Sequence, residues 1–402
     1  MKFRALSLPA IARSAKAGPC VVLLLMAWGS LAAQQERHYR YVAVPGSDVE
    51  ATDHGAPDIL VFDIDAAHKF VRRISPWSVP AQGSKPNPVA HGSRPGPSTV
   101  AQGFSPATSD EQVRGIAADV KARRLYLSTV RRIAAIDLLT GRVVWEKTYG
   151  EQCCDRLDVS PDGGTIYAPA LGKPRWLVIK AADGELIATV DVTGFPRQTI
   201  YSRDGRRAYL AAWESSVLSV VDTATHKVIR EVGPFGNFVC PFTINGRETF
   251  AFANVEGLVG FEVGDLNTGL ILDRVTVEGS ETETASKYEC PSHGIGLTPD
   301  ERELWVADGA GNRLHIFDAT SYPPAPVRTI ELRAPPRWIT FSIDGRYAYP
   351  STGDVIDTQS GKIVATLQDE RGAVVRSEKT IQIDFSGDSP IRSGHQVAIG
   401  HR

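Results

Sequence analysis

The chain of 402 residues is 42% apolar and 22% charged, which is enough apolar material for a large buried core. Its 36 glycines and 26 prolines indicate many turns, and only two methionines and few long apolar periodic stretches argue against a helical bundle. The formal net charge of −2 disfavours a nucleic-acid-binding protein, because proteins that neutralise phosphates are normally basic.

Residues 1–33 have the pattern of a secretory signal peptide. The first 19 residues are basic and contain no acid, residues 21–28 (VVLLLMAW) are apolar, and small residues follow at 30–33. This apolar run is shorter than the ~20 residues that span a bilayer. We therefore expect a soluble periplasmic or secreted protein with no membrane span after cleavage, and an uncleaved anchor is the alternative. Without residues 1–33, 40 basic and 46 acidic residues remain.

Two columns of residues repeat along the chain. An apolar pair followed by an acidic or polar residue recurs in VFD (61–63), AID (135–137), VIK (178–180), VVD (220–222), GFE (260–262), IFD (316–318) and VID (355–357). A turn residue is followed five positions later by an aromatic residue, as in Asp162/Tyr167, Asp204/Tyr209, Asn245/Phe250, Asp300/Trp305 and Asp344/Tyr349. Each unit of about 40 residues contains four short β-branched and aromatic strands, which is the signature of a β-propeller.

The repeats predict an all-β fold, a seven-bladed β-propeller of four-stranded blades over residues 39–400. The N-terminal unit lacks its first strand, and KTIQIDFS (379–386) follows the last unit without a unit of its own. We expect this segment to close the ring, so that N- and C-terminal strands share one blade and leave no open sheet edge. Residues 76–112 (rich in Pro, Gly and Ser) and the polar residues 279–289 are predicted to be insertions.

The units VSPDGGTIYAP, YSRDGRRAYLA and LTPDERELWVADGAGNRLHIFD resemble the YVTN-type repeats of secreted bacterial β-propellers. That group is related in fold to the heavy subunit of quinoprotein amine dehydrogenases. The resemblance implies the fold far more than an activity, because propellers include binding proteins, lactonases, lyases and electron-transfer subunits.

Residues at one position of the repeat are expected to meet at the mouth of the central channel. Seven positions before each turn stand Arg114, Asp155, Arg197, Phe238, His293 and Arg337. Convergent guanidinium groups suit a carboxylate or phosphate, which they bind in a bidentate manner. The alternative is that these arginines pair with Asp155, Glu151, Asp158 or backbone carbonyls and only join the blades.

Four cysteines remain outside the predicted signal peptide: Cys153, Cys154, Cys240 and Cys290. In an oxidising compartment they are disulfide candidates. Cys240 and Cys290 begin the inner strands of neighbouring blades and could pair, whereas Cys153 and Cys154 could stay reduced, pair with each other, or one could pair with Cys290. The Cys290-x-x-His293 spacing could offer two metal ligands, but a zinc site usually needs three or four, so no metal site is predicted.

AIDLLTGRVVW (135–145) resembles the tryptophan-docking motif of PQQ-dependent alcohol dehydrogenases, and Cys153-Cys154-Asp155 resembles the adjacent-cysteine segment that lies against PQQ in those enzymes. Those enzymes have eight blades, and the Asn-Arg-Gly run expected after the cysteines is absent here. The motif also has a simpler explanation as a tight turn followed by a Trp that packs between blades.

Together these features favour an exported binding or interaction module with an anionic small-molecule, peptide or protein partner at the basic mouth of the channel. The first alternative is a periplasmic enzyme of lactonase or lyase type, with His293 as catalytic base and the channel arginines as clamps. The second is a quinoprotein-like oxidoreductase subunit carrying PQQ. No cofactor is predicted in the favoured interpretation.

Overall fold

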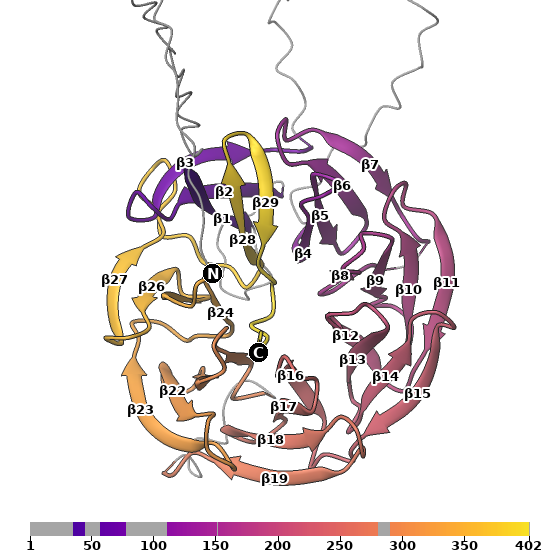
Figure 1. Cartoon of the computed structure of the whole chain (residues 1–402), viewed down its shortest axis with the longest axis vertical. Coiled ribbons are helices and arrows are strands. Elements are labelled where there is room, and N and C mark those ends of the chain that lie inside the picture. Colours follow the sequence, from indigo (N-terminus) through magenta and orange to yellow (C-terminus); the bar gives the residue numbers. More distant parts are fainter. Residues whose placement is uncertain (1–34, 45–56, 78–110, 151, 280–289, 402) are drawn as a thin grey trace, which may run out of the picture. The chain divides into compact units, whose positions relative to one another are not determined.

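The computed structural model describes residues 35–44, 57–77, 111–150, 152–279 and 290–401, all within one compact unit of residues 35–402. These residues form twenty-nine strands in seven antiparallel sheets, arranged as the blades of a propeller (Figure 1). The predicted fold class is therefore confirmed. The predicted signal peptide and almost all of the two predicted insertions lie outside the described residues. In the described part of the chain, no helix is long and apolar enough to cross a membrane.

In blades 2 to 7, four consecutive strands run from the channel to the outer edge. Blade 2 contains β4 (Val113–Asp119), β5 (Arg124–Thr129), β6 (Ile133–Asp137) and β7 (Val143–Lys147). Blade 3 contains β8 (Asp158–Val159), β9 (Thr165–Pro169), β10 (Arg175–Lys180) and β11 (Leu186–Asp191). Blade 4 contains β12 (Phe195–Tyr201), β13 (Arg207–Trp213), β14 (Leu218–Asp222) and β15 (Lys227–Val232).

The next three blades repeat this order. Blade 5 contains β16 (Val239–Ile244), β17 (Phe250–Val255), β18 (Gly260–Asp265) and β19 (Ile271–Thr276). Blade 6 contains β20 (Gly294–Leu297), β21 (Glu303–Asp308), β22 (Arg313–Asp318) and β23 (Ala325–Glu331). Blade 7 contains β24 (Ile339–Phe341), β25 (Tyr347–Pro350), β26 (Asp354–Asp357) and β27 (Lys362–Thr366).

Blade 1 joins the two ends of the propeller domain. It contains β1 (Glu36–Val44), β2 (Asp58–Asp63), β3 (Lys69–Ile74), β28 (Thr380–Ser386) and β29 (Ser389–Ser393), in the spatial order β29-β28-β1-β2-β3. The strands β1 and β28 pair antiparallel, with Tyr39 opposite Ile383. Closure of the ring by strands from both ends is therefore confirmed. In addition, β29 gives this blade a fifth strand that the sequence analysis did not predict.

The repeated turn after each inner strand is held by side-chain hydrogen bonds. In blade 4, the hydroxyl of Ser202 donates to the carboxylate of Asp204 (2.8 Å) and accepts the backbone N–H of Arg207 (2.9 Å). Ser160, Thr298 and Ser342 make the equivalent contacts in blades 3, 6 and 7. Because this turn fixes where the second strand begins, the aromatic residue five positions after the Asp is buried in blades 3, 4, 6 and 7, as Tyr209 is.

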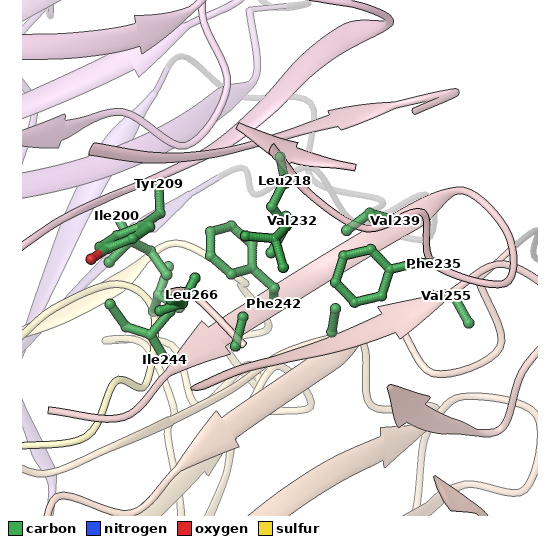
Figure 2. Close-up of a cluster of buried hydrophobic side chains, with 14 of the residues drawn as sticks. Ile200, Tyr209, Leu218, Val232, Phe235, Val239, Phe242, Ile244, Val255 and Leu266 are labelled. Atoms are coloured by element: carbon green, nitrogen blue, oxygen red, sulfur yellow. The ribbon is translucent and has the colours of Figure 1, made fainter. Parts of the chain in front are cut away.

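The core consists of apolar layers between neighbouring blades. Figure 2 shows the layer between blades 4 and 5, where Tyr209, Leu218 and Val232 of blade 4 pack against Phe242 and Ile244 of blade 5. Trp338 of blade 7 and Val397 belong to the same cluster. This layer therefore extends to the channel axis.

Candidate functional site

The residues that the repeat pattern placed at the channel mouth all stand where the inner strands begin. Arg114 is the second residue of β4 and Arg197 the third of β12, whereas Asp155, His293 and Arg337 lie one to three residues before β8, β20 and β24. Because the inner strands of a propeller run side by side around the axis, their first residues come together at one end of the channel.

Glu378 of blade 1 is the centre of the resulting ion-pair network. Its carboxylate accepts a hydrogen bond from Arg156, and it lies 3.1 Å from the Lys379 Nζ and 3.5 Å from the Arg337 Nε. The Nδ1 of His293 is 4.0 Å from the same carboxylate. Blades 1, 3, 6 and 7 thus contribute groups to one buried carboxylate.

Asp155 forms the second centre of the network. Its carboxylate lies 3.4 Å from the Arg197 Nη1 and 3.5 Å from the Arg156 Nη1. Arg156 therefore links the two carboxylates. Arg114 is the remaining cation, and its charge acts on both Asp155 and Glu378. We call these eight residues the channel cluster: Arg114, Asp155, Arg156, Arg197, His293, Arg337, Glu378 and Lys379.

The channel cluster has an excess of positive charge. It contains five cationic side chains and two carboxylates, and both carboxylates stay ionised at neutral pH. Burial raises the pKa of Asp155, but the charges of Arg156, Lys379 and Arg197 outweigh it and lower the pKa below its ordinary value. Burial likewise opposes ionisation of Glu378, and Lys379 and Arg156 lower its pKa well below the usual range. With His293 neutral, the cationic side chains of the cluster outnumber its carboxylates by three.

His293 is neutral at pH 7. Burial lowers its pKa to about 4, and the charges of Arg156 and Arg337 add to this effect, although Glu378 opposes it. The His293 Nδ1 lies 3.0 Å from the Arg337 carbonyl oxygen, so in the neutral ring the Nδ1–H donates to this oxygen. The Nε2 then carries the lone pair. His293 can accept a hydrogen bond there, but it is a weak base.

The cationic side chains differ in depth. The side chains of Arg156 and Lys379 are almost completely buried, whereas those of Arg197 and Arg337 are 34% and 18% exposed. The inner pair therefore neutralises the carboxylates, and the outer pair is accessible to a molecule that approaches this end of the channel.

The opposite end of the channel is crossed by residues 394–401, which we call the C-terminal segment (Figure 1). It contacts every blade through hydrogen bonds or an ion pair. Its partners are Gln382 of blade 1, Ile116 of blade 2, Leu157 and Asp158 of blade 3, Arg203 of blade 4, Thr243 and Ile244 of blade 5, Leu297 of blade 6 and Trp338 of blade 7. The segment therefore obstructs this end. We call the other end of the channel, where the channel cluster lies, the funnel.

Trp338 separates the funnel from the C-terminal segment. Its indole Nε1–H donates to the Gln396 carbonyl (2.8 Å), and the guanidinium of Arg156 lies 4.1 Å from its ring centre. A cavity of about 370 Å³ lies beside the C-terminal segment, with Asp158, Arg203 and His395 in its wall.

The cysteines form two disulfides. Cys240 and Cys290 join blades 5 and 6, which agrees with the pairing considered plausible from the sequence, and Cys153 pairs with Cys154. Because its sulfur belongs to the disulfide, Cys290 cannot act as a thiolate metal ligand beside His293. Among the described residues, no group of three or more His, Cys, Asp or Glu side chains is placed to hold a metal ion.

The segment that resembles a PQQ-enzyme docking motif has a structural role here. The indole of Trp145 is buried and donates to the Ala181 carbonyl of blade 3 (3.0 Å), so it joins blades 2 and 3. Cys153 and Cys154 are fully buried in the same apolar cluster. Phe238, the remaining member of the sequence column, is partly exposed at the beginning of β16.

Three residues of the channel cluster were missed by sequence reasoning: Arg156, Glu378 and Lys379. Arg156 directly follows Asp155, and the other two directly precede β28. A signal for Glu378 and Lys379 existed, because KTIQIDFS was recognised as the inner strand of blade 1. Glu378, which directly precedes this segment, and Lys379, its first residue, therefore had to face the channel like the residues before β20 and β24.

No known family model matches the chain. Among solved structures, the chain is similar to hydrazine synthase of Kuenenia stuttgartiensis, with a TM-score of 0.55 and 13% identity over 80% of this chain and 89% of that one. It is also similar to the β-propeller domain of Cps50 (Swd1) from Myceliophteria thermophila, with a TM-score of 0.55 and 8% identity over 76% of this chain and 87% of that one. At these identities the likeness shows the propeller fold alone.

Proposed function

We propose that this protein is an exported interaction module that binds an anionic group of a small molecule or peptide in the funnel above the channel cluster. The observation that carries the proposal is the charge balance of the cluster, in which five cationic side chains surround two carboxylates. The excess of cationic side chains attracts an anion, and the partly exposed guanidinium groups of Arg197 and Arg337 can donate hydrogen bonds to it.

The closed channel supports this proposal. Because the C-terminal segment obstructs the far end, we expect a ligand to approach from the end where Arg197 and Arg337 are partly exposed. Burial on the other sides reduces screening by water, which strengthens charge-assisted hydrogen bonds.

The direct test is isothermal titration calorimetry of the full chain with inorganic phosphate and with propionate. Arg197→Ala and Arg337→Ala are expected to weaken binding at least tenfold each, and added salt to weaken it further. The matched control is Arg206→Ala, because Arg206 belongs to the same blade as Arg197 but is 86% exposed in a turn. Absence of binding by the unaltered chain, or an equal loss in the control, would contradict the proposal.

The enzyme alternative assigns His293 the role of a general base. Its pKa of about 4 makes it a poor proton acceptor at neutral pH, which is why we prefer the interaction module. In the enzyme alternative, His293→Ala abolishes turnover without unfolding the protein. The quinoprotein alternative requires a chromophore that disappears when Cys153 or Cys154 is replaced, and both cysteines are fully buried.

We also propose that the protein belongs with the secreted YVTN-type propellers and is exported. The inter-blade disulfide between Cys240 and Cys290 supports an oxidising compartment. Mass spectrometry of protein recovered from the periplasm or the medium tests this proposal. We expect the mass of a chain that begins after residue 33, whereas a chain with an intact signal segment in the cytoplasmic fraction would contradict export.

A further inference from the structure

Three aromatic side chains stand at the funnel end of blades 4 and 5. Phe195 is the first residue of β12 and pairs in the sheet with Trp213, the last residue of β13, while Phe238 directly precedes β16. The backbone N–H of Val239 donates to the Ser215 carbonyl (2.8 Å), which holds the two blade ends together. We call Phe195, Trp213 and Phe238 the aromatic rim.

The aromatic rim presents unusual apolar surface to water. Phe195 and Phe238 are 40% and 37% exposed, although burial of a phenylalanine side chain is energetically favourable. The other strongly exposed large apolar residues include several on the outermost strands, such as Ile229 on β15 and Leu270 just before β19. Phe195 and Phe238 differ from these because they stand where the inner strands begin.

Arg197 connects the aromatic rim to the channel cluster. Its guanidinium lies 5.0 Å from the ring centre of Trp213 and 3.4 Å from the Asp155 carboxylate. Only Pro196 separates Arg197 from Phe195 in β12, and Phe238 occupies the position in blade 5 that Arg197 occupies in blade 4. The Arg197 guanidinium and the Trp213 ring therefore adjoin at this end of blade 4, and Phe195 and Phe238 stand at neighbouring strand beginnings.

Resting on the proposed function, we propose that the ligand of this site is an aromatic carboxylate, with its carboxylate on the channel arginines and its ring against the aromatic rim. Guanidinium groups pair with carboxylates through two parallel hydrogen bonds. Aromatic rings pack edge-to-face or offset against Phe and Trp, and this contact removes the exposed phenyl surface from water. The same chemistry is offered by a free aryl carboxylate and by the C-terminal residue of a peptide that ends in Phe, Tyr or Trp.

The experiment is a calorimetric titration of the full chain with four probes. These are propionate, 3-phenylpropionate, its neutral amide 3-phenylpropanamide, and the peptide Gly-Gly-Phe with a free carboxyl end. We expect 3-phenylpropionate to bind roughly ten- to a hundredfold more tightly than propionate, because burying a phenyl group on the aromatic rim adds its transfer free energy. Whichever of 3-phenylpropionate and Gly-Gly-Phe binds more tightly identifies the source of the carboxylate.

The variants Phe195→Ala and Phe238→Ala test the assignment of the rim. Each is expected to weaken 3-phenylpropionate at least fivefold and to leave propionate unchanged, since the arginines remain. Ile229→Ala is the matched control, because Ile229 is 54% exposed on the outer strand of the blade that carries Phe195. Unchanged melting temperatures of the three variants show that the fold is intact.

The outcomes separate the two proposals. The aromatic specificity is wrong, and the anion site stands, if 3-phenylpropionate binds no more tightly than propionate. The same conclusion follows if the rim variants bind both probes as tightly as the unaltered chain does. If the neutral amide binds as tightly as 3-phenylpropionate, or no probe binds at all, the anion site itself is wrong.

Discussion

The guanidinium of Arg156 lies 4.1 Å from the centre of the Trp338 ring, and the edge of the same indole donates a hydrogen bond to Gln396. Trp338 therefore supports the channel cluster on one side and anchors the C-terminal segment on the other. The positions of the buried charges and the obstruction of the channel depend on the same side chain.

Replacement of Trp338 by Phe should separate these two roles. The phenyl ring keeps an aromatic face for Arg156 but leaves the buried Gln396 carbonyl without its donor, which costs about 1–3 kcal/mol of unfolding free energy. Urea denaturation measures this loss. In a chain truncated after Gly394 the carbonyl is absent, so the same substitution should cost much less, and an equal cost in both chains would contradict the role of this hydrogen bond.

Glu378 is expected to be the most sensitive single residue of the channel cluster. Glu378→Gln removes the carboxylate that faces Arg156, Arg337 and Lys379, and leaving buried charges uncompensated typically costs about 3–5 kcal/mol. The control is Glu331→Gln, whose side chain is 72% exposed in an ion pair with Arg313 and should change stability by less than about 1 kcal/mol. Comparable losses in the two variants would show that the network does not depend on Glu378.

The fold could be predicted from the sequence because its information is local. Each inner strand ends in a Ser/Thr-x-Asp or related turn whose hydrogen bonds span only five residues. The turn motif is therefore recognisable within one blade, and its return in the next blades identifies the repeat. The convergence of Arg114, Asp155, Arg197, His293 and Arg337 follows from the same repeat.

The rest depends on contacts between distant parts of the chain. The C-terminal segment contains no periodic pattern, and its positions are fixed by backbone bonds such as Leu297 N–H to the Ala398 carbonyl. The sequence also could not rank the cysteine pairings, because only the assembled blades bring Cys240 and Cys290 to a Cα separation of 6.2 Å.

The disulfide between blades 5 and 6 should stabilise the propeller. It closes a loop of about 50 residues, for which the chain-entropy model gives about 4 kcal/mol. Cys240→Ala combined with Cys290→Ala is expected to lower the unfolding free energy by about 2–5 kcal/mol under non-reducing conditions. With both disulfides formed, mass spectrometry of the unaltered chain should show a mass four hydrogen atoms below that of the reduced chain. Free thiols at these positions in the native protein would contradict the pairing.

The depressed pKa of His293 predicts a loss of stability in mild acid. Its folded-state pKa of about 4 lies below the ordinary value of 6.5, so between these values the unfolded chain binds a proton that the folded chain does not. Stability from this group is present above pH 6.5 and falls as the pH decreases, by about 2 kcal/mol between pH 7.5 and 5.

The variant His293→Asn, which retains a donor for the Arg337 carbonyl, should lack this part of the pH dependence. Urea midpoints at pH 7.5 and 5 measure the difference between the two chains. If both lose the same stability over this interval, His293 titrates normally in the folded protein and the assigned environment is wrong.

The central claim is that an anion binds at the channel cluster, and anomalous diffraction from a crystal soaked in selenate tests it most directly. We predict a selenium peak in the funnel within hydrogen-bonding distance of the Arg197 and Arg337 guanidinium groups, and its loss in the Arg197→Ala chain. Selenate bound only at other surfaces, with an empty funnel, would contradict the account.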